Sequence, residues 1–414
     1  MRPFALVLVA CLVACGADDE PQTSNAAGAP VVDGRLQEAQ RALMRGEVGS
    51  ARALAAKLGS GLDEELLRAR LVFVEGDEAG AFRRLEELRV QYPSDDRPYA
   101  TLAELHAARG RGLDAQTELQ RGLAAAGRTP ALGRAEGVLL LSRPGGAAEG
   151  LVVLQQALAD DPALPYVALP LAQAHLLLGR RFLGEGRADV AEVQARQALE
   201  FDPTGVEPRE LLGDCLAALR RFDDALAIFD ELASEGRELT AVRVDLRVKA
   251  ATAALLTKDR PAAIEHYAAA RALGADAQQL GFGSHLLDEA ADASIDAGLQ
   301  LLRRDDGAGA APHFERAIAL MDDHIEAWNY LGHARFRHSD AAGAARAWRH
   351  VLRLAGDDVQ LPEPVVVHLA KAERRAGELE RAIETLESYL RERPDDPWRD
   401  EVERLLRVLL AERE

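Results

Sequence analysis

Apolar and polar positions follow one another in a pattern that returns along most of the chain. Three stretches show it: EGDEAGAFRRLEELRVQYPSD at 75–95, GGAAEGLVVLQQALADDPAL at 145–164 and GRADVAEVQARQALEFDPTG at 186–205. Each has a turn glycine, a predicted helix with small residues at a fixed offset, and a proline near its end. This self-similarity indicates stacked helical units, whereas length alone would suggest two or three globular domains.

Composition changes this picture in two ways. The chain is 48% hydrophobic but only 5% aromatic, and its formal net charge is -18. Because β-branched and aromatic residues favour strands, their scarcity argues against sheets and for an all-α fold. A nucleic-acid-binding protein needs a basic face to meet phosphates, so the negative charge argues against that class of partner.

The recurring unit resembles the tetratricopeptide repeat, a helix-turn-helix of 34 residues. The clearest match is 172–205, with Gly179, Phe182 and Ala191 in place, and 206–239 follows without a gap. The resemblance implies an all-α, right-handed superhelical solenoid of about ten helix pairs. Further units in this register are predicted at 62–95, 96–129, 131–164, 244–277, 291–324, 325–358 and 363–396, with a partial one at 32–61.

In this family repeat positions 8, 20 and 27 are small, and positions 7, 11 and 24 are large and apolar. Small residues let helices approach closely, and the large ones fill the space that remains. Arg335 departs from the pattern, because it stands at position 11 of 325–358. A stripe that includes Val402, Leu405 and Leu409 predicts a capping helix within 397–414.

These patterns also predict how the chain is divided. An N-terminal array is expected at 32–277 and a C-terminal array at 291–396, followed by the capping helix at 397–414. Between the arrays, QQLGFGSHLLDEA at 278–290 lengthens one connection and is interpreted as an insert or joint.

Residues 8–15 read LVACLVAC, at the end of a short apolar run that follows one cation. Residues 1–14 therefore have the layout of a secretory signal peptide, and the run is shorter than the roughly 20 residues that span a bilayer. Each LVAC resembles the bacterial lipobox. The resemblance implies cleavage and lipidation at Cys15, because cutting at Cys11 would leave a shorter apolar core; an ordinary signal peptide is the alternative.

After Cys15, residues 15–31 are predicted to be a lipidated flexible tether, because they are rich in Ala, Gly, Asp and Pro. Gly16 follows the cysteine where an aspartate would resemble an inner-membrane retention signal. The resemblance therefore favours an outer-membrane lipoprotein that faces the periplasm.

The sequence contains no P-loop, no GxSxG, no HExxH and no paired CxxC. His333 and His338 are five residues apart, which does not suit a metal site on one helix, and surface histidines are the favoured interpretation. Cys215 is interpreted as a small buried hydrophobe. We therefore expect no catalytic residues, no metal and no cofactor, and hence no enzyme.

The remaining candidate surface comes from the family resemblance. Partner peptides of tetratricopeptide proteins lie along the concave face made by the first helices, especially at repeat positions 2, 5, 9 and 12. In the last two units this face carries polar and cationic residues that could hold a carboxylate, although ordinary solvated side chains are an alternative. The candidate partner-binding residues are Asn329, His333, Phe336, Arg337, Lys371, Arg374 and Arg375.

The resemblance implies a non-catalytic scaffold or adaptor in the bacterial envelope that binds protein or peptide segments. An accessory subunit of an envelope enzyme acting on polysaccharide or peptidoglycan is the alternative. Both roles rest on a likeness of fold, and a fold does not by itself specify a function.

Overall fold

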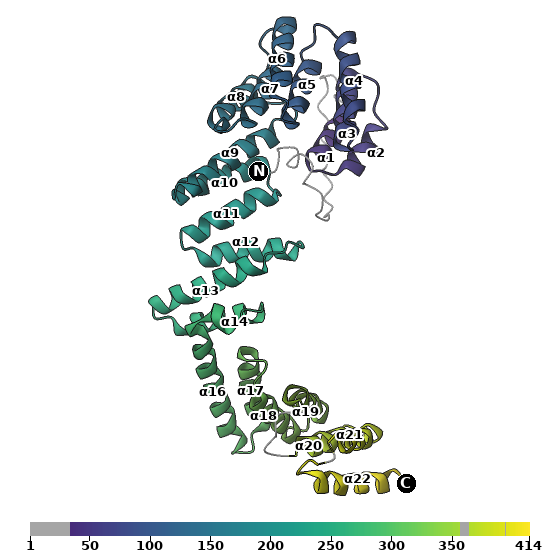
Figure 1. The fold of residues 1–414 in the computed structure, drawn as a ribbon, viewed down its shortest axis with the longest axis vertical. Helices are drawn as coiled ribbons and strands as arrows, with labels where there is room; N and C mark the ends of the chain where they lie inside the picture. The colour runs from purple at the N-terminus through teal and green to yellow at the C-terminus, as the bar shows by residue number, and fades with distance from the viewer. Residues whose placement is uncertain (1–33, 357–363, 394) are drawn as a thin grey trace, which may run out of the picture. The chain divides into compact units, whose positions relative to one another are not determined.

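The computed structural model describes residues 34–356, 364–393 and 395–414, and these are folded into 22 helices without a strand. Contacts divide the chain into two units, one ending at Leu239 and the other running from Thr240 to Glu414. Within each unit, successive helices lie side by side (Figure 1).

The first unit contains six helix pairs in its described part. In each pair the two helices contact each other, and each pair contacts the next. The helices are α1 (Gly34–Met44), α2 (Val48–Ala55), α3 (Leu62–Val74), α4 (Glu78–Gln91), α5 (Arg97–Ala108), α6 (Gly112–Ala126), α7 (Pro130–Leu141), α8 (Ala147–Asp160), α9 (Ala168–Gly184), α10 (Ala188–Phe201), α11 (Val206–Ala218) and α12 (Phe222–Ser234).

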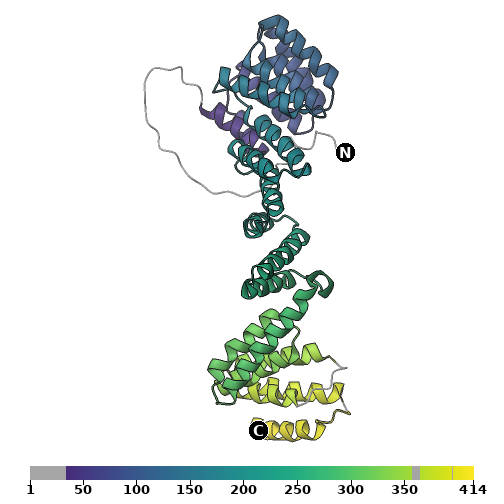
Figure 2. The same cartoon turned by 90° about the vertical axis from the view of Figure 1, so that its left-hand side faces the viewer.

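The second unit contains four helix pairs, one short helix and a terminal helix among its described residues. Its helices are α13 (Thr240–Leu256), α14 (Arg260–Ala272), α15 (Ala277–Leu280), α16 (Phe282–Leu302), α17 (Gly307–Leu320), α18 (Ile325–Arg337), α19 (Ala341–Ala355), α20 (Val365–Arg375), α21 (Leu379–Glu392) and α22 (Arg399–Arg413). The stack ends on α22, drawn in yellow at the C-terminus in Figure 2, which packs on α21 and α20.

The predicted all-α fold of about ten helix pairs closed by a terminal helix is therefore confirmed. The cap works as expected, because Val402 and Leu409 of α22 are fully buried against the last pair while the rest of the helix carries charged residues.

A repeated contact inside the pairs explains why the pattern needs a small residue in the first helix. A Cβ at Gly213 would lie 2.7 Å from the ring of Phe229, and a Cβ at Gly332 would lie 2.6 Å from the ring of Trp348. The aromatic residue stands sixteen positions after the glycine in both pairs. The glycine thus provides the space in which the ring of the second helix packs, at the close contact typical of protein interiors.

The division between the units does not fall at the predicted joint. Residues 282–290, taken from the sequence to be part of an insert, form the beginning of the 21-residue helix α16. Leu286 and Leu287 are buried in the same hydrophobic cluster as α14 and α17. Their apolar side chains make this segment part of the stack, and the contacts divide instead between Leu239 and Thr240.

The signal peptide, Cys15 and the tether at 15–31 lie outside the described residues. Within the described ranges, no helix is both long enough and apolar enough to cross a membrane.

Candidate functional site

The predicted groove residues of α18 surround an aromatic cluster. The indole Nε1–H of Trp348 donates a hydrogen bond of 2.9 Å to Asn329 Oδ1. The ring of His333 stands edge-on to Trp348, with centroids 5.2 Å apart, and lies 4.9 Å from the ring of His368. His368 stacks on Trp348 at 5.4 Å. The first helices α18 and α20 therefore meet through aromatic rings over one buried tryptophan.

Phe336 extends this cluster toward Arg375 of α20. Its ring lies 5.8 Å from that of Trp348, and the guanidinium of Arg375 lies over it at 5.0 Å. Arg375 also donates to the backbone oxygen of Phe336 at 3.4 Å and to Ser339 Oγ at 3.3 Å. A cation over an aromatic face is attracted by the ring quadrupole, which holds Arg375 in place.

The other three predicted residues lie apart from this cluster. Arg337 donates to Leu302 O at 2.9 Å and pairs with Asp305, so it ties α18 to the preceding pair. Arg374 pairs with Glu412 of α22 at 2.8 Å. Lys371 is exposed and has no ion pair within the described part of the chain.

The structure thus brings together Asn329, His333, Phe336 and Arg375, and it places Arg337 and Arg374 against other elements. Two cluster members, Trp348 and His368, were not among the predicted site residues. Trp348 fits repeat position 24 and so indicates core packing, and no sequence signal shows that His368 stacks on it.

A second polar cluster lies in the first unit, across three successive first helices. The carboxylate of Glu104 on α5 accepts a hydrogen bond of 2.6 Å from Arg134 Nε on α7 and pairs with Arg70 on α3. Arg134 also donates to Pro165 O at 2.5 Å, and Arg70 donates to Thr101 Oγ1 at 3.3 Å. The carboxylate is therefore held between two guanidinium groups.

Burial and the two cations set the protonation of this cluster. Glu104 is only 6% exposed, and burial alone would favour its neutral form. Burial opposes ionisation, yet Arg134 and Arg70 hold the pKa of the Glu104 carboxyl below its usual value. Tyr166 covers the cluster with its ring 4.5 Å from the Arg70 guanidinium, and burial raises the pKa of its hydroxyl to about 12.

The sequence register could have predicted half of this cluster. Arg70 and Glu104 both occupy position 9 of adjacent predicted units, so they lie on the same face of neighbouring first helices. Arg134 stands at position 4 of its unit, and the connection before α9 brings Tyr166 over the cluster with a left-handed φ of 62°. Neither of these contributions follows from the repeat pattern.

Metal-ligating side chains do not gather in the part of the chain that is described. No set of three or more His, Cys, Asp or Glu side chains there could hold a metal ion. Cys215 is buried, and its burial raises the pKa of the thiol to about 11, so it stays protonated at neutral pH.

Comparison with known protein families matches two segments of the chain. Residues 182–243, which include α10 and α11, match one tetratricopeptide repeat model, and residues 365–396, with α20 and α21, match another. The chain therefore contains tetratricopeptide repeats. These repeats generally mediate protein–protein interactions by binding protein or peptide partners, and the fold is typically non-enzymatic.

Solved structures of helical repeat proteins are similar to the chain at low identity. They include the type IV pilus biogenesis factor PilW (19% identity, TM-score 0.35, covering 54% of this chain and 98% of that one). The TPR domain of P58(IPK) matches at 17% identity and a TM-score of 0.26, covering 85% of this chain and 99% of that one. The TPR2AB domain of yeast Sti1 in complex with pHSP90 matches at 15% identity and a TM-score of 0.27, covering 58% of this chain and 98% of that one. No curated protein matches the sequence.

Proposed function

We propose that the protein is a non-catalytic interaction scaffold, anchored by lipid in the bacterial envelope, that binds acidic segments of partner proteins on the first helices of its second unit. The observation that carries this proposal is the group of cations on α20, Lys371, Arg374 and Arg375, beside the aromatic cluster of α18.

The state of each cation supports this function. Lys371 is exposed, and within the described residues it makes no ion pair that a partner would have to replace. Arg374 does pair with Glu412, but both side chains are about half exposed, at 46% and 40%. Since an exposed ion pair contributes about 0–1 kcal/mol, a partner carboxylate can replace Glu412 at little cost.

The aromatic cluster supplies the orientation that cations alone lack. Arg375 is held over Phe336, so its remaining donors have a defined direction. A carboxylate that accepts charge-assisted hydrogen bonds from these groups would be recognised by position as well as by charge. On a chain with a formal net charge of -18, such a local group of cations favours acidic partners over basic ones.

The binding surface is tested by crosslinking in intact cells followed by affinity purification. The double variant Lys371→Glu/Arg374→Glu should lose the crosslinked partners, because both side chains are exposed and their reversal repels a carboxylate. Asn329 is left unchanged because it accepts the Trp348 hydrogen bond. The matched control is Arg391→Glu, an exposed cation on the second helix α21.

Partners that are retained by the double variant at the wild-type level would refute this surface. Partners lost equally from Arg391→Glu would show that total charge matters, and the proposed surface would again be wrong. A hydrolase of polysaccharide or peptidoglycan among the lost partners would favour the role of an accessory subunit.

The lipid anchor is proposed from LVAC at 12–15 and the polar residues that follow it. Two or three acyl chains on Cys15 make membrane attachment stable, because each buried CH₂ contributes about 0.8 kcal/mol. Mass spectrometry of the mature N-terminus should find a diacylglyceryl cysteine, and Cys15→Ser should release the protein from the outer-membrane fraction. An unmodified mature N-terminus would contradict the anchor.

A further inference from the structure

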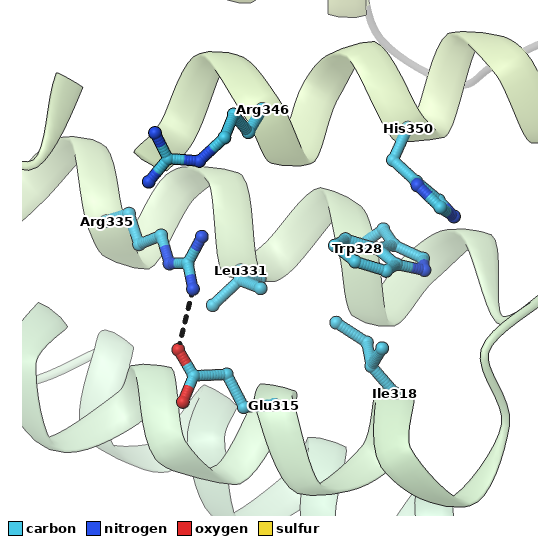
Figure 3. Close-up of a pocket in the computed structure, with 7 residues that line it drawn as sticks. All are labelled: Glu315, Ile318, Trp328, Leu331, Arg335, Arg346 and His350. Atoms are coloured by element: carbon cyan, nitrogen blue, oxygen red, sulfur yellow. Dashed lines mark hydrogen bonds and ion pairs between the residues drawn. The ribbon is translucent and has the colours of Figure 1, made fainter. Parts of the chain in front are cut away.

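A small open pocket lies between the second helix of one pair and both helices of the next. Its volume is about 310 Å³. The pocket lies on a different face of α18 from the groove residues. Its residues Trp328, Leu331 and Arg335 follow one another at helical spacing and so share one face of the helix. Trp328 is one position before Asn329 and Leu331 is two positions before His333, which turns this face away from the groove. The pocket is lined by Glu315 and Ile318 of α17, Trp328, Leu331 and Arg335 of α18, and Arg346 and His350 of α19 (Figure 3).

The departure of Arg335 from the repeat pattern explains why the pocket is open. Other units carry a large apolar residue at position 11, such as Phe182 or Leu301, whereas this unit carries Arg335. The Arg335 guanidinium pairs with Glu315 at 2.8 Å (Figure 3) and approaches Asp340 at 3.9 Å. The guanidinium also donates to Gly343 O at 3.4 Å, so the Arg335 side chain ends on polar partners and lines the space beside Leu331 without filling it.

One end of the pocket carries an uncompensated positive charge. Arg335 is balanced by its acidic neighbours, but Arg346 is exposed and makes no ion pair in the described part of the chain. In Figure 3 the two arginines lie together at this end. An anionic group that reaches this end would meet a free guanidinium without first breaking an existing pair.

The opposite end is aromatic, with the Arg353 guanidinium donating to His350 Nδ1 at 2.6 Å at its edge. The rings of Trp328 and His350 stack with centroids 3.9 Å apart, and Trp328 Nε1–H donates to Asp322 O at 2.8 Å, which fixes the indole. Burial and the neighbouring Arg353 lower the pKa of His350, so the imidazole is neutral near pH 7. With Ile318 and Leu331 beside it, this end suits an apolar side chain.

The spacing between the two ends defines the occupant. Arg346 and His350 are one helical turn apart, about 6 Å, and Trp328 and Arg335 are about 10 Å apart along α18. In an extended peptide, side chains at i and i+2 point to the same side about 7 Å apart. We propose that the pocket binds an extended segment of a partner protein with the pattern acidic–x–apolar, its carboxylate on Arg346 and its apolar side chain against Trp328 and Leu331.

This site is independent of the proposed groove function and is tested with a defined probe. The probe is a fluorescein-labelled peptide, Gly-Ser-Glu-Ala-Phe-Ser-Gly, amidated at its C-terminus so that no terminal carboxylate can bind elsewhere. Fluorescence polarisation against the full chain should show saturable binding. Replacing Glu by Gln, or Phe by Ala, in the peptide should weaken binding at least about tenfold, the factor that corresponds to 1.4 kcal/mol.

Arg346→Glu should also weaken binding at least tenfold, and a peptide with Lys in place of Glu should then bind this variant better than it binds the wild type. Because Arg346 is exposed, its replacement should leave the circular dichroism spectrum unchanged. The matched control Arg391→Glu changes the same charge at an exposed position of α21, away from the pocket, and should leave the affinity within twofold. Absence of saturable binding to the wild type, equal binding by Arg346→Glu, or equal weakening by Arg391→Glu would each overturn the proposal.

Discussion

Replacing Glu104 by glutamine should destabilise the first unit by about 3–5 kcal/mol, the cost expected when one partner of a buried ion pair is removed. The structure supports a value in this range because the Glu104 carboxylate is 6% exposed and pairs with two guanidinium groups, those of Arg134 and Arg70. Glutamine keeps the size of the side chain but leaves both cations without a counter-charge. The matched control is Glu136→Gln, whose ion pair with Arg128 is exposed and should contribute less than about 1 kcal/mol.

Urea titration can show which unit loses stability in Glu104→Gln. Trp328, Trp348 and Trp398 are the three tryptophans of the chain, and all lie in the second unit. Circular dichroism should therefore show an earlier transition in Glu104→Gln, whereas tryptophan fluorescence should change little. Hydrogen exchange should accelerate in α3, α5 and α7, because these helices meet at the carboxylate. A loss of stability no larger than that of Glu136→Gln would show that solvent screens the cluster, and it would refute the predicted magnitude.

The pH dependence follows from the same contacts. Two arginines lower the pKa of Glu104 in the folded state despite its burial, so the folded protein holds this proton less tightly than the unfolded chain. The stabilisation is therefore present above the unfolded pKa of about 4.3 and is lost as the pH falls through the lowered folded pKa. Glu104→Gln should remove this acid sensitivity, and a variant as acid-sensitive as the wild type would contradict the assignment.

Three further predictions concern packing. Gly332→Ala should cost about 1–3 kcal/mol because its Cβ would lie 2.6 Å from the Trp348 ring, whereas Gly184→Ala, with nothing within 4 Å, should be neutral or stabilise by up to about 1 kcal/mol; thermal melts compare them. Trp348→Ala should cost about 3–5 kcal/mol in urea titrations, because its side chain is 1% exposed. Cys215 should resist Ellman's reagent at pH 8 in the folded protein and react on unfolding; rapid reaction of the folded protein would contradict its burial and raised pKa.

The helix pairs could be predicted because their determinants are local. Gly213 and Phe229, or Gly332 and Trp348, belong to one pair and lie sixteen residues apart, so a single unit of sequence contains both partners of the contact. The turn glycines and the capping stripe of α22 are equally local. Because the same contact recurs in successive units, the register of the helix pairs could be predicted from the sequence.

The candidate site was predictable only in part. Repeat positions placed Asn329, His333 and Phe336 on one face, and the structure brings these residues together. The same positions grouped Arg374 with them, yet its long side chain pairs with Glu412, thirty-eight residues later. A register specifies the face from which a side chain starts, but it does not specify where a flexible guanidinium ends.

By itself, the sequence determined the fold class, the helix pairs and the terminal cap, because each depends on spacings shorter than one repeat. Tertiary structure decided which charges meet, as at Arg70, Glu104 and Arg134, and where the contacts divide, between Leu239 and Thr240. It also turned the departure at Arg335 into an open pocket. These features depend on packing between different helix pairs, where competing partners and the space left by neighbouring side chains determine the contacts. Because those partners are distant in the sequence, no local pattern predicts which contacts form.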